Sequence, residues 1–253
     1  MKKMENKIKM LRVNSDNFNP NSPYEVYQEI YEEIKEEEMI SDTVLQEILE
    51  LPNELGSRLL QGDILEKFEY FTSSQLQIIE QFIHQRIHDR DSVFVSSLID
   101  CANFNHILSF HDICIEFIKR RRNHIVVLSA LDYLFEHMNF HDIHKIVAVF
   151  NRVLNNKKYY QNCQTIASFY LFRITHHQKY YDFLKSLILD GDEINGLVLK
   201  NSLQGMDYNK KKYFAHFDDL MAIIKESKVK KEMIIEGDSN KKHIPNPNPN
   251  KRR

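Results

Sequence analysis

The sequence predicts an all-α protein, and three observations lead to that prediction. The 253-residue chain contains only six glycines and six prolines. No proline lies between residues 53 and 244. Folds rich in strands need frequent turn residues, so this scarcity favours helices joined by short polar links. Apolar residues also recur at intervals of three and four, which places them on one face of a helix.

The N-terminal part of the chain divides into a leader and an acidic helical region. Residues 1–21 have no continuous apolar stretch of the kind that a secretory signal needs, and we expect a flexible leader. Residues 22–52 are strongly acidic and carry two helix signals. The capping box at Ser22–Glu25 begins a first helix. A second helix is expected from Ser41 to Leu51, where a proline follows.

A short motif recurs along the middle of the chain. Its copies are FHDI at Phe110–Ile113, FHDI at Phe140–Ile143, YYDF at Tyr180–Phe183 and FDDL at Phe217–Leu220. In each copy an aromatic residue lies two positions before the aspartate, and apolar residues lie one and five positions after it. These positions fall within about 60° on a helix, so they are expected to pack inward while the aspartate points outward. The motif therefore predicts a helix start, with Ser109 and Asn139 as caps of the first two copies.

Each copy of the motif follows another segment of helical periodicity. These segments are 92–104, 124–138, 160–177 and 193–206. Units of 30 to 40 residues with two helices each resemble HEAT or armadillo repeats, over residues 60–227. The resemblance implies a short α-solenoid of antiparallel helix pairs, with 53–228 as the repeat domain. The alternative is a non-repetitive helical bundle. Residues 229–253 are rich in Pro, Asn and basic residues and are expected to form a disordered tail.

Several features limit the class of protein. Cys101, Cys114 and Cys163 lie in apolar helical surroundings without metal-binding or disulfide spacing, so we expect buried, reduced thiols in a cytoplasmic protein. No run approaches the roughly 18 apolar residues of a membrane span. There is no glycine-rich phosphate loop and no GxSxG motif, so the sequence implies no cofactor and no nucleophilic serine.

The segment NFHDIHKI, residues 139–146, also resembles the metal-binding motif of HD-domain phosphohydrolases. That family holds one or two metals that activate a water for attack on a phosphate ester. The ligands that the resemblance implies are His111, His141, Asp142 and either Asp182 or Asp190. His144 stands where the family usually has glycine. Later copies of the motif lose the histidine but keep the aromatic residue and the aspartate, so the repeat favours a helix start over a metal site.

Other histidines also have spacings that metal sites use. His84 and His88 are four residues apart, but no glutamate adjoins His84, so the metalloprotease motif is absent. His141 and His144 share a helix face, with His137 close by in sequence. A polar, solvated helix edge is the more ordinary explanation of this group.

The sequence favours a non-catalytic protein–protein interaction module, such as a scaffold, adaptor or toxin-neutralising protein. The residues expected to contact the protein partner are Lys119, Arg120, Arg121, Arg122, His141 and His144. An HD-like metal-dependent phosphohydrolase is the alternative, and a nucleic-acid enzyme of HEAT-like architecture is the third hypothesis. Nucleic acid is disfavoured because the chain has no tryptophan and a net charge of −2.

Overall fold

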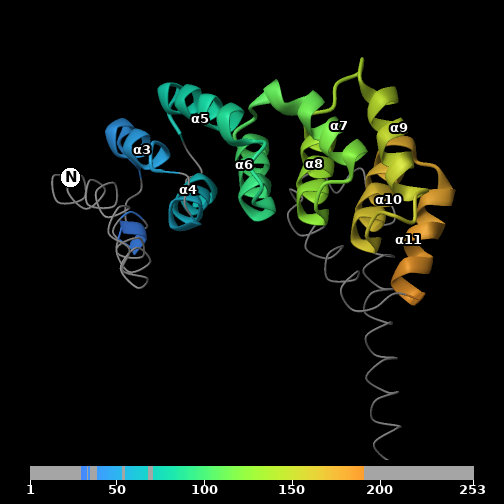
Figure 1. Cartoon of the computed structure of the whole chain (residues 1–253). Coiled ribbons are helices and arrows are strands. Elements are labelled where there is room, and N and C mark those ends of the chain that lie inside the picture. The colour runs from blue at the N-terminus through green and yellow to red at the C-terminus, as the bar shows by residue number, and fades with distance from the viewer. Residues whose placement is uncertain (1–29, 33, 35–38, 53–54, 68–70, 191–253) are drawn as a thin grey trace, which may run out of the picture. The chain divides into compact units, whose positions relative to one another are not determined.

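The computed structural model is helical throughout the part of the chain that it describes, which is residues 30–32, 34, 39–52, 55–67 and 71–190 (Figure 1). No strand occurs in those residues, so the all-α prediction is confirmed. The chain divides into two compact units, residues 1–153 and 154–253. The predicted leader, the tail, the helix start at Ser22 and the motif copy at Phe217 lie outside the described residues.

The two units share a simple composition of short helices. The helices in the first unit are α3 Asp42–Leu49, α4 Leu55–Lys67, α5 Ser73–Arg86, α6 Ser92–Phe104, the 3-10 helix η1 Leu108–Phe110, α7 His111–Arg120, α8 His124–Glu136 and α9 Ile143–Leu154. The second unit contains α10 Gln161–Thr175 and α11 Gln178–Asp190, which pack against each other. The predicted helical segments 92–104, 124–138 and 160–177 correspond to α6, α8 and α10. The fourth predicted segment, 193–206, is outside the described residues.

Within the first unit, α4, α6 and α8 pack side by side in chain order (Figure 1). Helix α7 packs on α8, while α3 packs on both α4 and α5. Ser96 of α6 and Ser129 of α8 share a buried hydrogen bond of 2.7 Å at their interface. These contacts describe helix packing inside one unit. The HEAT-like solenoid and the bundle alternative both stay predictions.

Several helices begin at a polar side chain that accepts hydrogen bonds from the first turn. These caps are Ser41 for α3, Thr72 for α5, Asp91 for α6 and Asn123 for α8. A cap of this kind stabilises a helix by about 1 kcal/mol. The start of α3 after Ser41 was expected from the sequence. Gln75 completes a capping box with Thr72 and also donates to the Ile40 carbonyl at 2.7 Å, which ties α5 to the start of α3.

The repeated motif lies at the start of a helix in its three described copies, but its apolar positions are not equivalent. Phe110 and Tyr180 are buried, whereas Phe140 is 86% exposed. Residues 140–142 form a turn before α9 begins, so Phe140 is not on the helix face that packs inward. The buried residues of α9 are Ile146, Val149, Phe150 and Val153. The prediction that Phe140 packs in the core is therefore wrong.

The start of α7 also differs from its predicted form. No side chain caps this helix, so the proposed Ser109 cap is wrong, and η1 leads into α7 instead. Tyr133 of α8 holds the segment that leads into α7 in place. Its hydroxyl donates to the Ile107 carbonyl at 2.6 Å and accepts from the Phe110 amide at 3.3 Å. Burial raises the pKa of the Tyr133 hydroxyl, which keeps it protonated as the donor.

Each unit buries its own apolar residues. Phe110, Tyr133 and Phe150 are fully buried in the first unit, and Phe169 is fully buried in the second. Burying one such side chain contributes about 2–3 kcal/mol. The three cysteines are buried, as predicted, and burial raises the pKa of the Cys101 thiol to about 12. Among the described residues, no helix has the length and apolar character needed to cross a membrane.

Candidate functional site: a basic edge of the first unit

The turn between α5 and α6 is organised by two aspartates. Asp89 accepts a hydrogen bond from Arg86 Nη2 at 3.2 Å and another from the Asp91 amide at 3.0 Å. The side chains of Asp89 and Arg86 are only 7% and 15% exposed. Asp91 Oδ1 caps α6 by accepting from the amides of its first turn at 3.0 and 3.3 Å. Charge-assisted hydrogen bonds in such positions contribute about 1.5–3 kcal/mol each, so the turn is held firmly.

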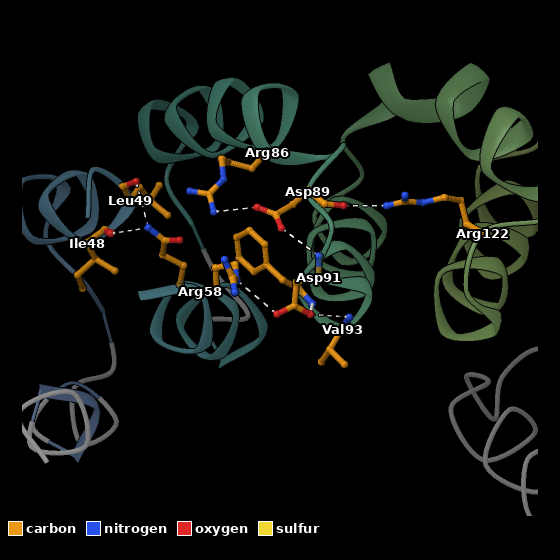
Figure 2. A network of polar contacts seen from close by, with 10 residues as sticks. Ile48, Leu49, Arg58, Arg86, Asp89, Asp91, Val93 and Arg122 are labelled. Atoms are coloured by element: carbon orange, nitrogen blue, oxygen red, sulfur yellow. Dashed lines mark hydrogen bonds and ion pairs between the residues drawn. The ribbon is translucent and has the colours of Figure 1, made fainter. Parts of the chain in front are cut away.

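Two more arginines join this turn to neighbouring elements. Arg122, from the turn between α7 and α8, donates from Nη2 to the Asp89 carbonyl at 2.8 Å (Figure 2). Its guanidinium also lies over the Phe117 ring, 5.4 Å from the centroid. Arg58 of α4 places Nε 3.3 Å from Asp91 Oδ2. The predicted partner-binding residue Arg122 therefore binds within the protein and links two inter-helix turns.

The same two turns carry cationic side chains on their outer surface. Lys119 and Arg120 at the end of α7 and Arg121 just after it are exposed, and His88 and Arg90 are exposed before α6. The groups are adjacent because His88 contacts the Phe117 ring edge-on, with centroids 5.7 Å apart. We call His88, Arg90, Lys119, Arg120 and Arg121 the basic edge. Arg120 pairs with Glu116 at 2.9 Å, an exposed interaction that contributes little to stability.

The charge balance around the basic edge is positive. The cations of the edge and its supporting network are Arg58, Arg86, Arg90, Lys119, Arg120, Arg121 and Arg122. Three carboxylates, Asp89, Asp91 and Glu116, form the ion pairs described above. These residues together carry four more positive than negative charges, without counting His88. A surface of this kind attracts acidic partners over a range set by salt screening, about 8–10 Å.

Arg121 has an unusual backbone conformation at the centre of this edge. Its φ and ψ are 52° and 54°, in the left-handed region where glycine is favoured. The Arg121 amide donates to the Ile118 carbonyl at 3.0 Å, and the Arg122 amide donates to the Phe117 carbonyl at 3.1 Å. This is a Schellman termination, which usually places glycine at the left-handed position. This conformation costs a residue with a Cβ about 1–2 kcal/mol. His106 and His176 adopt it as well, after α6 and α10.

The two predicted histidines lie elsewhere in the first unit, at the start of α9. His141 and His144 are both exposed. Asn139 Oδ1 accepts from the amides of His141 and Asp142 at 2.9 and 3.1 Å, and its Nδ2 donates to Asp142 Oδ2 at 2.7 Å. The predicted interaction of Asn139 with Asp142 is thus present, although the regular helix begins only at Ile143.

An ion pair connects the first FHDI copy to α9. Lys145 Nζ lies 2.8 Å from Asp112 Oδ1, and both side chains are exposed. The hydrogen bond from Lys145, and then its charge, lower the pKa of Asp112. Solvent screens such a pair, so its effect on stability is small. It nevertheless gives the exposed aspartate of the first copy a contact with α9 that the sequence did not indicate.

The metal-binding hypotheses find no support in the described geometry. Among the residues that the structure describes, no three His, Cys, Asp or Glu side chains are arranged to hold a metal ion. His111 has its Nδ1 3.9 Å from Asp112 Oδ1. His84 lies against the Phe110 ring, with centroids 4.5 Å apart, and His88 against Phe117, so each packs on an aromatic residue of α7 or its start.

His137 occupies a half-buried position that the sequence did not indicate. Its ring stacks at a tilt on Tyr133, with centroids 4.7 Å apart, and meets His106 edge-on at 5.5 Å. His137 Nε2 lies 3.2 Å from the Asn103 carbonyl. Burial lowers the pKa of His137, and the nearby His106 and His111 act in the same direction. His137 therefore joins the ends of α6 and α8 and does not accompany His141 and His144.

Comparison with protein-family models, with curated proteins and with solved structures finds no match to this chain. Its function is therefore inferred from its own residues.

Proposed function

We propose that the protein is a non-catalytic interaction module whose basic edge binds an acidic surface of a partner protein. The observation that carries the proposal is the placement of exposed cations at or beside two turns that are fixed by partly buried ion pairs and hydrogen bonds. Arg90 lies between Asp89 and Asp91, and Lys119 to Arg121 directly precede Arg122. Because these turns are already ordered, binding costs little further backbone entropy.

The conformation of Arg121 gives independent support. Glycine would satisfy the same helix termination at lower conformational cost, so stability alone does not account for an arginine at this position. Strained backbone positions are often kept where a side chain has a role in binding. The proposal includes a HEAT-type architecture of stacked helix pairs, because such modules expose their inter-helix turns along one edge. It also includes a cytoplasmic location.

A protein partner fits the charge pattern better than nucleic acid does. Three carboxylates are interspersed among the cations of the edge and its network, and an extended polyanion would lie close to them. An acidic protein surface of limited size can match such a pattern charge by charge. The HD-like hydrolase and the nucleic-acid enzyme have no such supporting observation.

The proposal is tested by charge reversal on the full-length protein. The edge variant carries Lys119→Glu, Arg120→Glu and Arg121→Glu. The control variant carries three exposed lysines of the second unit reversed in the same way, Lys157→Glu, Lys158→Glu and Lys185→Glu. Affinity capture from the native cells, followed by quantitative mass spectrometry, measures the stoichiometric partner. We expect the edge variant to lose at least about tenfold of the captured partner, and the control to retain it.

Equal recovery by the wild type and the edge variant would contradict the proposal. So would capture of nucleic acid by the wild-type edge, with salt-sensitive binding and no stoichiometric protein. Circular dichroism and thermal unfolding of both variants establish that each remains folded, since exposed substitutions of this kind change stability by only about 0.5 kcal/mol each.

A further inference from the structure

The N-terminal part of the chain carries the opposite charge to the basic edge. Between residues 25 and 50, ten side chains are acidic and one, Lys35, is basic. We call residues 25–50 the acidic region. It carries nine more negative than positive charges, whereas the whole chain has a net charge of −2. Two copies of the chain therefore repel each other little as whole molecules, while the acidic region of one copy is attracted to the basic edge of another.

The described part of the acidic region is packed against the rest of the first unit. Ile30 and Ile34 are 0% and 1% exposed. Gln61 of α4 donates from Nε2 to the carbonyls of Ile48 and Leu49 at 3.0 and 3.2 Å, which joins the end of α3 to α4. The bond from Gln75 to the start of α3 joins its other end to α5. This helix is therefore held in place at both ends before any partner binds.

The described carboxylates of the acidic region lie on the outer side of that packing. Glu32, Asp42 and Glu50 are exposed. Asp42 Oδ2 accepts a hydrogen bond from the Ser74 hydroxyl at 3.2 Å, and Glu50 Oε1 accepts one from the Gln46 amide at 2.9 Å. Both donors are uncharged, so these hydrogen bonds orient the two carboxylates and leave their negative charge at the surface.

The central cations of the basic edge are not neutralised within their own copy. In the part of the chain that the structure describes, Lys119 and Arg121 form no ion pair, and Arg120 pairs with Glu116 one turn earlier in α7. An acidic surface from outside therefore meets two exposed cations without first displacing an internal carboxylate from either of them. The charge of the acidic region is complementary to exactly this kind of surface.

We propose that the basic edge of one copy binds the acidic region of a second copy of this chain. The inference deepens the proposed function and rests on it, because it assigns the acidic partner surface to the chain itself. Exposed ion pairs are individually weak and are screened by salt. We therefore expect a salt-sensitive association with a Kd of about 10–100 µM at low ionic strength.

Sedimentation velocity of the full-length protein, at about 5–200 µM and in about 50 or 500 mM NaCl, tests the inference. The wild type is compared with the edge variant of the capture experiment and with an acidic-region variant, Glu32→Lys with Glu50→Lys. The matched control reverses two exposed carboxylates outside the acidic region, Glu136→Lys and Asp182→Lys. Circular dichroism establishes that each variant is folded.

We expect the wild type and the matched control to associate at low salt and to dissociate at high salt. The edge variant and the acidic-region variant, each alone, are expected to associate at least about tenfold more weakly. An equimolar mixture of these two variants is expected to recover association. The edge variant supplies an intact acidic region and the acidic-region variant an intact basic edge, so one native contact forms between them.

The inference is overturned if the wild type stays monomeric at about 200 µM and low salt, since the expected Kd lies below that concentration. It is also overturned if the edge variant associates as the wild type does, or if the mixture recovers nothing. A monomeric wild type, together with loss of a different captured protein by the edge variant, removes the inference alone. Unchanged capture by the edge variant removes the proposed function, and the inference falls with it because it needs the same edge.

Discussion

Replacing Arg121 by glycine is predicted to stabilise the protein, in contrast to the usual effect of glycine near a helix. Arg121 has a φ of 52° at the left-handed position that ends α7. A residue with a Cβ pays about 1–2 kcal/mol there, and glycine avoids that cost. Glycine also makes the unfolded chain more flexible, which opposes the gain by about 0.4–1 kcal/mol. The expected net change is a stabilisation of about 0.5–1 kcal/mol.

The comparison that isolates this effect is between Arg121→Gly and Arg121→Ala, because both remove the charged side chain. Glycine is expected to be more stable than alanine by about 1 kcal/mol at this position. Arg152 is the matched control, since it is exposed on α9 in ordinary helical conformation. There the order reverses, and alanine is expected to exceed glycine by about 1 kcal/mol.

Urea unfolding of the four variants measures these differences, and the corresponding shift in Tm is about 2–4 °C per kcal/mol. If Arg121→Ala is more stable than Arg121→Gly, then Arg121 does not hold the left-handed conformation, and the idea of a conformational cost retained for binding is refuted. The account also requires Arg121→Gly to bind the partner less well despite its greater stability.

Two more predictions concern the supporting network and the half-buried His137. Asp89→Ala removes the carboxylate that pairs with the largely buried Arg86, so we expect the free energy of unfolding in urea to fall by about 3 kcal/mol. The exposed control Asp182→Ala is expected to lower it by less than about 0.5 kcal/mol. Similar losses in the two variants would contradict the role of Asp89. Burial lowers the pKa of His137 in the folded state; the Asn103 carbonyl and Glu136 oppose this shift, and His106 and His111 assist it. The unfolded chain therefore binds a proton first as pH falls, and the contribution of neutral His137 is present above about pH 6.5 and is lost below it. Urea midpoints at about pH 7.5 and 5.5 are expected to fall less in His137→Gln than in the wild type, and an equal fall would show that His137 is not responsible.

Local signals in the sequence were sufficient to predict the helices. The absence of proline and the spacing of apolar residues predicted α6 at its observed bounds, and α8 and α10 within two residues at each end. The start of a helix at Ser41 was equally local, and the structure shows why: the Ser41 hydroxyl accepts a hydrogen bond from the Val44 amide three residues later. The burial of Cys101 followed from its apolar neighbours.

The errors arise where a tertiary contact overrides a local pattern. Phe140 matches Phe110 in sequence, but a turn at 140–142 moves it off the buried face of α9. The Ser109 cap was displaced by η1 and by the hydroxyl of Tyr133, which comes from the next helix. The apolar periodicity of α7 and α9 encodes neither event.

The candidate site was predicted only in part, for the same reason. The run from Lys119 to Arg122 was expected to contact the partner, but its last residue reaches back 33 positions to the Asp89 carbonyl. Asp91 directly precedes the predicted helical segment 92–104, and this position could have identified it as a cap. Nothing in the sequence placed Arg58 beside it, because that contact depends on how α4 packs on α6.

The most direct test of the central claim is partner capture by the charge-reversed edge. In native cells, the full-length protein with glutamate at positions 119, 120 and 121 is compared with the wild type and with the lysine-reversal control of the second unit. The account predicts that the stoichiometric partner falls at least about tenfold in the edge variant alone. Unchanged capture by a folded edge variant would contradict the claim that this surface binds an acidic protein.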